Sequence, residues 1–175
     1  MKGKTHAIIG ANVVWIPFLV GTVVDPWLVA VGALAALLPD LDASESKIKN
    51  LKVGGYIGGT KIWFKPFLPI AFVISSIFRH RGVMHSLLIL ILLSVGLMSA
   101  IPNTYSVITL VIMLGYVSHL VLDALTKSGI EFFWPIKKRL GLLPKALRVK
   151  TGGIVDTLLL LVGSVGVVLF LYNAF

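Results

Sequence analysis

Five long runs of apolar residues divide the chain, and short polar or basic segments separate them. The runs cover residues 7–24, 27–38, 87–101, 105–122 and 154–172. Asp156 is the single charged side chain within them. Apolar stretches of this length are typical of helices that cross a lipid bilayer. Small residues such as Gly32 and Ala36 in the second run would let such helices pack closely.

A further apolar run, 66–78, is shorter and has Pro66 and Pro69 at its start. As a helix of about 13 residues it would rise only about 20 Å, which is less than the roughly 30 Å of a bilayer core. A tilted or extended helix could still cross, but the length favours a short helix that is interfacial or half-inserted.

The basic segments predict the orientation. Residues 43–65 and 127–150 are rich in lysine and arginine, and loops of this kind stay on the cytoplasmic side. An even number of crossings must therefore separate them. Three apolar runs lie between these segments, so one of them does not cross, and the shortest, 66–78, is the one we expect to stay interfacial or half-inserted. The sequence predicts an all-α, polytopic membrane helix bundle with about five crossings. We expect one domain over 1–175, with the N-terminus in the cytoplasm.

Composition narrows the classes of function. The chain is 57% hydrophobic and has no cysteine, which excludes disulfides, thiolate metal ligands and a cysteine nucleophile. Its net charge of +9 would raise nucleic-acid binding in a soluble protein. In a membrane protein the same charge serves topology and contact with anionic lipid head groups, so no nucleic-acid partner is expected.

A glycine-rich stretch in the first basic segment comes near a phosphate-binding loop. It is Gly54-Gly55-Tyr56-Ile57-Gly58-Gly59-Thr60-Lys61. The last two residues are in the reverse of the order that such a loop requires, and no strand is predicted before it. We expect a flexible loop here and no nucleotide site.

The ionisable residues gather at one end of the predicted helices. All four histidines and three of the seven acidic residues fall into four clusters there. The clusters are His6, Asp40 with Asp42, His80 with His85, and His119 with Asp123. In the expected topology they share one depth on the cytoplasmic side. Ionisable groups are costly at such positions, so they indicate function.

The spacing within each cluster allows its side chains to converge. His119 and Asp123 are four residues apart, which places both on one face of a helix. The two aspartates of the second cluster would face the same way in an extended backbone. The two histidines of the third cluster bracket Gly82, where the chain can bend.

Imidazoles and carboxylates in this number suit a divalent metal, with zinc first and manganese or iron as alternatives. Seven donors exceed what one tetrahedral zinc needs. Two ions about 3.5–4 Å apart, or one ion whose ligands are oriented by the remaining residues, are both open. Three of the clusters, taken alone, could be a helix cap or a hydrogen bond at or between helix ends, whereas His80 with His85 is harder to explain in this way. The coincidence of all four clusters at one depth favours one or two ions.

Residues beside the clusters have more than one interpretation. Arg81 could hold a phosphate or carboxylate or could extend toward the lipid surface. Ser86 is expected to cap the helix that begins after it. Glu131 and Asp156 could be acid–base residues or partners of metal ligands, and Asp156 also suits the start of a helix. Arg81 and Asp42 are the residues that we expect to be catalytic.

Four ordered motifs carry a family resemblance that covers nearly the whole chain. They are Thr5-His6, Pro39-Asp40-Leu41-Asp42, His80-Arg81-Gly82-x-x-His85-Ser86, and Ser118-His119-x-x-x-Asp123-x-x-Thr126-x-x-Gly129 followed by Trp134-Pro135. They resemble the membrane-bound, LexA-regulated metal-dependent hydrolases of the YdjM type. Met84 departs from that family, which often has threonine there. The resemblance implies a prokaryotic inner-membrane hydrolase, and the pattern is similar, by analogy only, to zinc-dependent phospholipase C.

The sequence thus supports two hypotheses. The first is a hydrolase at the cytoplasmic bilayer surface, where metal-activated water attacks a phosphoester of a lipid or other amphiphile and Arg81 stabilises the developing charge. An acyl ester or amide is a less favoured substrate. The alternative is a non-enzymatic metal-binding membrane protein, acting as a sensor, scaffold or transporter. Transport is disfavoured because 87–101 and 105–118 carry few polar groups along a path.

Overall fold

The computed structural model describes residues 1–42, 50, 52–57, 60–69, 72 and 83–174. Helices dominate this part of the chain, as the apolar runs predict. They are α1 (Gly3–Ala11), α2 (Trp15–Leu19), α3 (Leu28–Ala35), α5 (Leu87–Ala100), α6 (Ser106–Ala124) and α7 (Ile154–Ala174). Short 3-10 turns lie at Asn12–Val14, Leu38–Asp42, Val83–His85, Asn103–Tyr105 and Lys145–Leu147.

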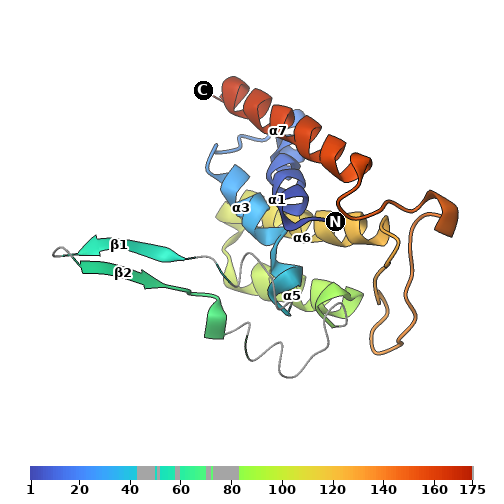
Figure 1. Cartoon of the computed structure of the whole chain (residues 1–175). Coiled ribbons are helices and arrows are strands. Elements are labelled where there is room, and N and C mark those ends of the chain that lie inside the picture. The colour runs from blue at the N-terminus through green and yellow to red at the C-terminus, as the bar shows by residue number, and fades with distance from the viewer. Residues whose placement is uncertain (43–49, 51, 58–59, 70–71, 73–82, 175) are drawn as a thin grey trace.

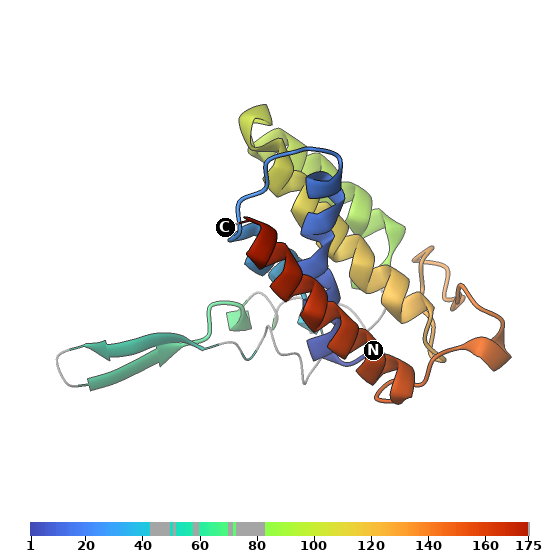
Figure 2. The same cartoon turned by 90° about the horizontal axis from the view of Figure 1, so that it is seen from above.

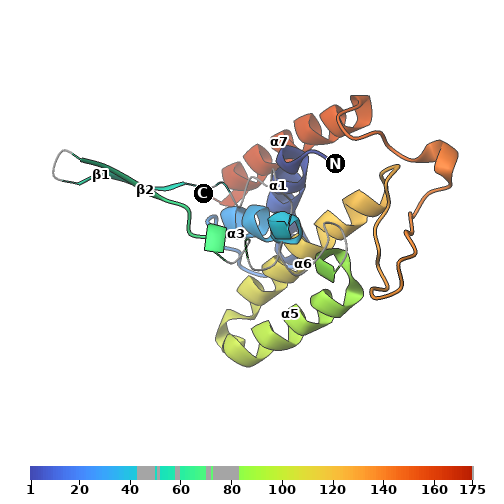
Figure 3. The same cartoon turned by 60° about the horizontal axis from the view of Figure 1, so that its bottom comes forward.

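Helix α6 lies at the centre of the bundle. Helices α1 and α3 pack against it, α5 lies along another side, and α7 packs on α1 (Figures 1 and 2). Figure 3 shows α7, α1, α6 and α5 in this order across the molecule. Three fully buried residues belong to one apolar core: Val14 of the 3-10 turn after α1, Val111 of α6 and Phe170 of α7. This order brings the start of the chain onto α6.

Glycines allow α1, α3 and α6 to cross at close range. A Cβ atom on Gly32 would lie 2.3 Å from the carbonyl oxygen of Gly10, and one on Gly115 would lie 2.7 Å from the carbonyl oxygen of Gly32. Side-chain carbons do not approach backbone oxygens so closely, so glycine is required at these crossings. The close packing indicated by small residues in the second apolar run is present, and it sets the spacing of three helices that carry polar side chains.

Five membrane crossings are not supported by the described part of the chain. Two helices there are long and apolar enough to cross a membrane, Asn103–Ala124 and Ile154–Ala174. Helix α3 has eight residues and rises only about 12 Å. The first apolar run is interrupted at Asn12, whose amide donates 2.8 Å hydrogen bonds to the carbonyl oxygens of Ile8 and Gly163. Apolar length alone does not reveal such breaks.

A β-hairpin takes the place of the flexible loop expected over 54–61, and it adds two short strands to a chain that is otherwise mostly helical, as predicted. Strands β1 (Val53–Ile57) and β2 (Thr60–Phe64) pair antiparallel, with Val53 opposite Phe64 and Ile57 opposite Thr60. β-branched and aromatic residues in both strands favour this conformation over a loop. The hairpin projects away from the helices (Figure 1). The interfacial helix predicted for 66–78 falls mostly on residues outside the described ranges.

Candidate metal centre

Helix α6 supplies the base of a cluster of histidine and aspartate side chains. His119 and Asp123 point to the same face of α6, as their spacing predicts, and their side chains are 0% and 1% exposed. His119 Nε2 lies 4.0 Å from Asp123 Oδ2. The nearby glycine crossing at Gly115 brings α3 against this face. A carboxylate and an imidazole are thus buried together at the helix crossing.

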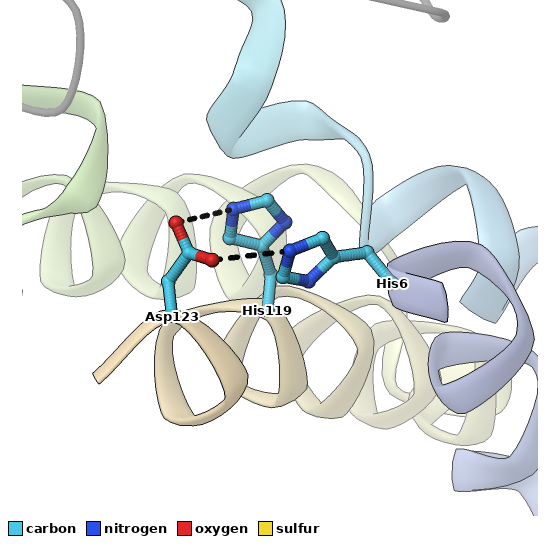
Figure 4. Close-up of side chains that lie close together, drawn as sticks. All are labelled: His6, His119 and Asp123. Carbon is cyan, nitrogen blue, oxygen red and sulfur yellow. Dashed lines mark ion pairs between the residues drawn. The ribbon is translucent and has the colours of Figure 1, made fainter. Parts of the chain in front are cut away.

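Helix α1 adds His6 to this pair. His6 Nε2 lies 3.2 Å from Asp123 Oδ1, and the imidazole ring stacks on that of His119 at a centroid distance of 3.8 Å and an angle of 19°. Figure 4 shows the three side chains converging from α1 and α6. His6 Nδ1 is buried, and no described residue forms a hydrogen bond with it. His6, His119 and Asp123 offer donor atoms within 4.8 Å of one another.

Two short 3-10 turns complete the cluster with Asp40 and His85. His85 Nε2 lies 3.2 Å from His119 Nε2 and 3.8 Å from Asp40 Oδ1. Asp40 Oδ1 is 3.7 Å from His119 Nε2, and Asp123 Oδ2 is 3.8 Å from His85 Nε2. Asp40, His85 and His119 form a second group within 4.8 Å, so His119 belongs to both groups. The Asp40 side chain is 22% exposed, which makes it the member that solvent reaches.

The carbonyl group of Ala36, the residue that follows α3, determines which ring nitrogen of His119 carries a hydrogen. His119 Nδ1 lies 2.7 Å from the carbonyl oxygen of Ala36. A carbonyl oxygen only accepts, so Nδ1 must carry the hydrogen, and a neutral ring then has a lone pair on Nε2. That lone pair faces a second imidazole nitrogen and carboxylate oxygens of Asp40 and Asp123. These groups repel one another unless a proton or a cation lies among them.

Sequence reasoning missed two groups that shape the cluster. The α-amino group of Met1 lies 2.5 Å from Asp123 Oδ1 and is buried, so a positive charge already meets this carboxylate. The Tyr116 hydroxyl donates to the carbonyl oxygen of Met84 and so holds the turn that carries His85. Tyr116 lies within an apolar run of the sequence, and the sequence alone does not indicate that its hydroxyl group makes this hydrogen bond. Ser86 caps α5, as predicted, by accepting from the backbone N–H of Ile89.

The remaining predicted residues are placed differently. The side chains of Asp42, His80 and Arg81 lie outside the described part of the chain. Glu131 pairs with Arg139, whose Nε lies 3.4 Å from Glu131 Oε1. Asp156 binds the start of the chain instead of the cluster: its Oδ2 accepts from the backbone N–H groups of Lys2 at 3.2 Å and Gly152 at 2.6 Å. It acts on His6 only through that segment.

Asp156→Ala is expected to lower the free energy of unfolding by about 1–2 kcal/mol. The change leaves the N–H groups of Lys2 and Gly152 without their acceptor at a partly buried position and frees the segment before His6. Thermal unfolding in detergent would measure this loss. Asp25→Ala, at an exposed turn residue, is the control, and equal melting of the two variants would contradict the structural role of Asp156.

The fold and the cluster define a mostly helical protein with two candidate membrane spans and a buried histidine–aspartate centre. The chain belongs to the YdjM inner membrane protein family, whose model matches residues 1–175. The resemblance seen in the sequence motifs is therefore confirmed at the level of the family, and with it the location in a membrane.

Individual relatives agree with this assignment. The chain is 35% identical over 162 residues to the uncharacterized protein YvsG of Bacillus subtilis (strain 168), which covers 91% of this chain and 88% of the relative. It is 31% identical over 120 residues to the inner membrane protein YdjM of Escherichia coli (strain K12) and of Shigella flexneri, covering 66% of this chain. That match spans 53% of the YdjM proteins' length. No solved structure matches the chain.

Proposed function

We propose that the protein is a metal-dependent hydrolase of the inner membrane that cleaves a phosphoester of a lipid or other amphiphile. The observation that carries the proposal is the orientation of His119. Its Nδ1 bonds to the Ala36 carbonyl, so its Nε2 lone pair faces His85, Asp40 and Asp123. A histidine that ligates a metal donates its other ring nitrogen in this way.

The donor set fits one divalent ion, and two ions stay within the proposal. Three imidazoles and two carboxylates are the ligand types that zinc accepts, with manganese and iron as alternatives. His119 is shared by both groups of donors. The ligands that we propose are His6, Asp40, His85, His119 and Asp123, with Asp42 and His80 added from the sequence. The buried His6 Nδ1 has no hydrogen-bond partner among the described residues, which supports the proposal because this ring nitrogen is not committed to another bond.

A divalent ion held here supplies Lewis acidity, which polarises a phosphoryl oxygen and makes water nucleophilic near neutral pH. The chain's own residues orient and admit the reactants. Asp40 is the partly exposed member, so substrate and water approach from its side. Arg81 and Asp42 remain the proposed catalytic residues, with the guanidinium of Arg81 binding the phosphoryl oxygens in two parallel hydrogen bonds. We place the centre on the cytoplasmic side because the basic segments favour that orientation.

Removal of the metal tests this function. Protein stripped with EDTA is expected to lose hydrolysis of phosphatidic acid in mixed micelles, and added zinc to restore it. Asp40→Asn is expected to lower kcat about 100-fold, whereas the matched control Asp25→Asn at an exposed turn keeps the wild-type rate. Release of inorganic phosphate is the readout.

The outcomes separate the alternatives. Bound zinc without hydrolysis of phosphoesters, acyl esters or amides would favour the non-enzymatic metal-binding protein. A protein without metal, and with the same thermal stability in chelator, would favour a scaffold. One observation favours the scaffold: the α-amino group of Met1 and the His6 ring both contact the Asp123 carboxylate directly.

A further inference from the structure

An apolar cavity of about 440 Å³ lies on the side of α6 that faces α5. Its walls come from α5, α6 and the segment 130–142. The lining includes Leu90, Leu120, Val121, Ile130, Phe132 and Leu142. A cavity of this volume is large enough for a small-molecule ligand, and every side chain that lines it is apolar. Such a lining favours a ligand that is hydrocarbon in character.

Backbone hydrogen bonds build the outer wall of this cavity. Ile130 and Leu140 exchange two of them, at 2.9 and 2.8 Å. Leu142 N donates to the Ala124 carbonyl at 2.9 Å, and Leu87 N donates to the Phe132 carbonyl at 2.9 Å. The segment is thus fastened to both α5 and α6. The pocket is a formed part of the fold and does not depend on loosely packed side chains.

The positively charged side chain of Arg148 lies at the edge of the pocket. Gly141, one of the lining residues, lies directly beneath the guanidinium of Arg148, because a Cβ there would be 2.5 Å from Arg148 Cζ. Arg148 Nε donates to the Leu143 carbonyl at 2.9 Å. Within the described part of the chain, no acidic side chain neutralises Arg148, whereas Arg139 nearby is paired with Glu131. Arginine is suited to bind a phosphate group.

We propose that this pocket binds one acyl chain of an anionic phospholipid, with the phosphate of that lipid on Arg148. Charge complementarity selects the anionic lipid, and the membrane surroundings of the family supply it. Leu120 and Ala124 in the wall directly follow His119 and Asp123 along α6, so the lipid lies on the helix that bears the metal centre. Lipid binding here goes beyond the proposed function and does not require it.

Native mass spectrometry of the purified full chain in mild detergent tests the proposal with phosphatidylglycerol and phosphatidylcholine as probes. We expect one tightly bound phosphatidylglycerol per chain and at least 10-fold weaker binding of phosphatidylcholine. Val121→Trp fills the pocket from a position that is 42% exposed, and it should lower lipid binding at least 10-fold. Val162→Trp on α7, which is 69% exposed, is the matched control.

A separate variant tests the positive charge of Arg148. Arg148→Gln should remove the preference for phosphatidylglycerol, and Lys145→Gln, at an exposed residue, should keep it. Equal binding of both lipids by the wild-type protein, or unchanged binding by Val121→Trp with normal helical content, would overturn the proposal. The measurement is made with and without EDTA, so failure of the lipid site is distinguished from failure of the metal centre.

Discussion

His119→Asn is expected to lower the affinity for zinc by more than about 100-fold, because His119 Nε2 is shared by both groups of donor atoms. Asparagine is chosen because its amide can still donate to the Ala36 carbonyl, which His119 Nδ1 contacts at 2.7 Å. The variant therefore removes the candidate ligand atom and keeps the hydrogen bond that holds α6 to the end of α3. Competition with a chromophoric chelator would give the affinity.

Ser118→Ala is the matched control for this variant. Ser118 neighbours His119 on α6, and its hydroxyl donates to the Gly115 carbonyl of its own helix at 2.7 Å, so its removal leaves the cluster intact. Elemental analysis of both purified proteins should show metal in the control and none in His119→Asn. Stoichiometric zinc in His119→Asn would remove the basis of the proposed function, since the orientation of His119 carries it.

The sequence predicts the members of the cluster better than it predicts the membrane topology. The spacing of His119 and Asp123 places them on one face because a helix repeats every 3.6 residues, and this holds in the structure. Three further residues lie close to this pair: His6, Asp40 and His85. The sequence suggests this proximity because all of them fall at the same end of the predicted helices. Their role as ligands stays a prediction.

Contacts between distant segments could not be read in the same way. The bond from His119 to the Ala36 carbonyl joins residues 83 positions apart, and no local pattern encodes it. The 3-10 turn that begins at Asn12 is joined to α7 by the hydrogen bond from the Asn12 amide to the Gly163 carbonyl, and no local pattern indicates this bond. The hairpin β1–β2 was missed because glycines in a basic segment suggested a loop, while β-branched and aromatic residues on both sides decided the structure.

The second large effect is expected at a residue that touches no polar group of the cluster. Gly32→Ala should lower the free energy of unfolding by about 3 kcal/mol. Its Cβ would lie 2.3 Å from the Gly10 carbonyl oxygen and 3.2 Å from Val13 Cγ2, so α1 and α3 must separate. Unfolding in detergent, followed by circular dichroism, measures the change.

Gly96→Ala on α5 shows that the effect of Gly32→Ala comes from helix crossing and not from glycine itself. No atom lies within 4 Å of a Cβ at Gly96, so alanine there should be neutral or stabilise the helix by up to about 1 kcal/mol. Separation of α1 and α3 also moves His6 and the Ala36 carbonyl relative to His119. Gly32→Ala should therefore weaken zinc binding together with stability. Wild-type zinc affinity in this variant would mean that the centre does not depend on the close crossing of α1, α3 and α6.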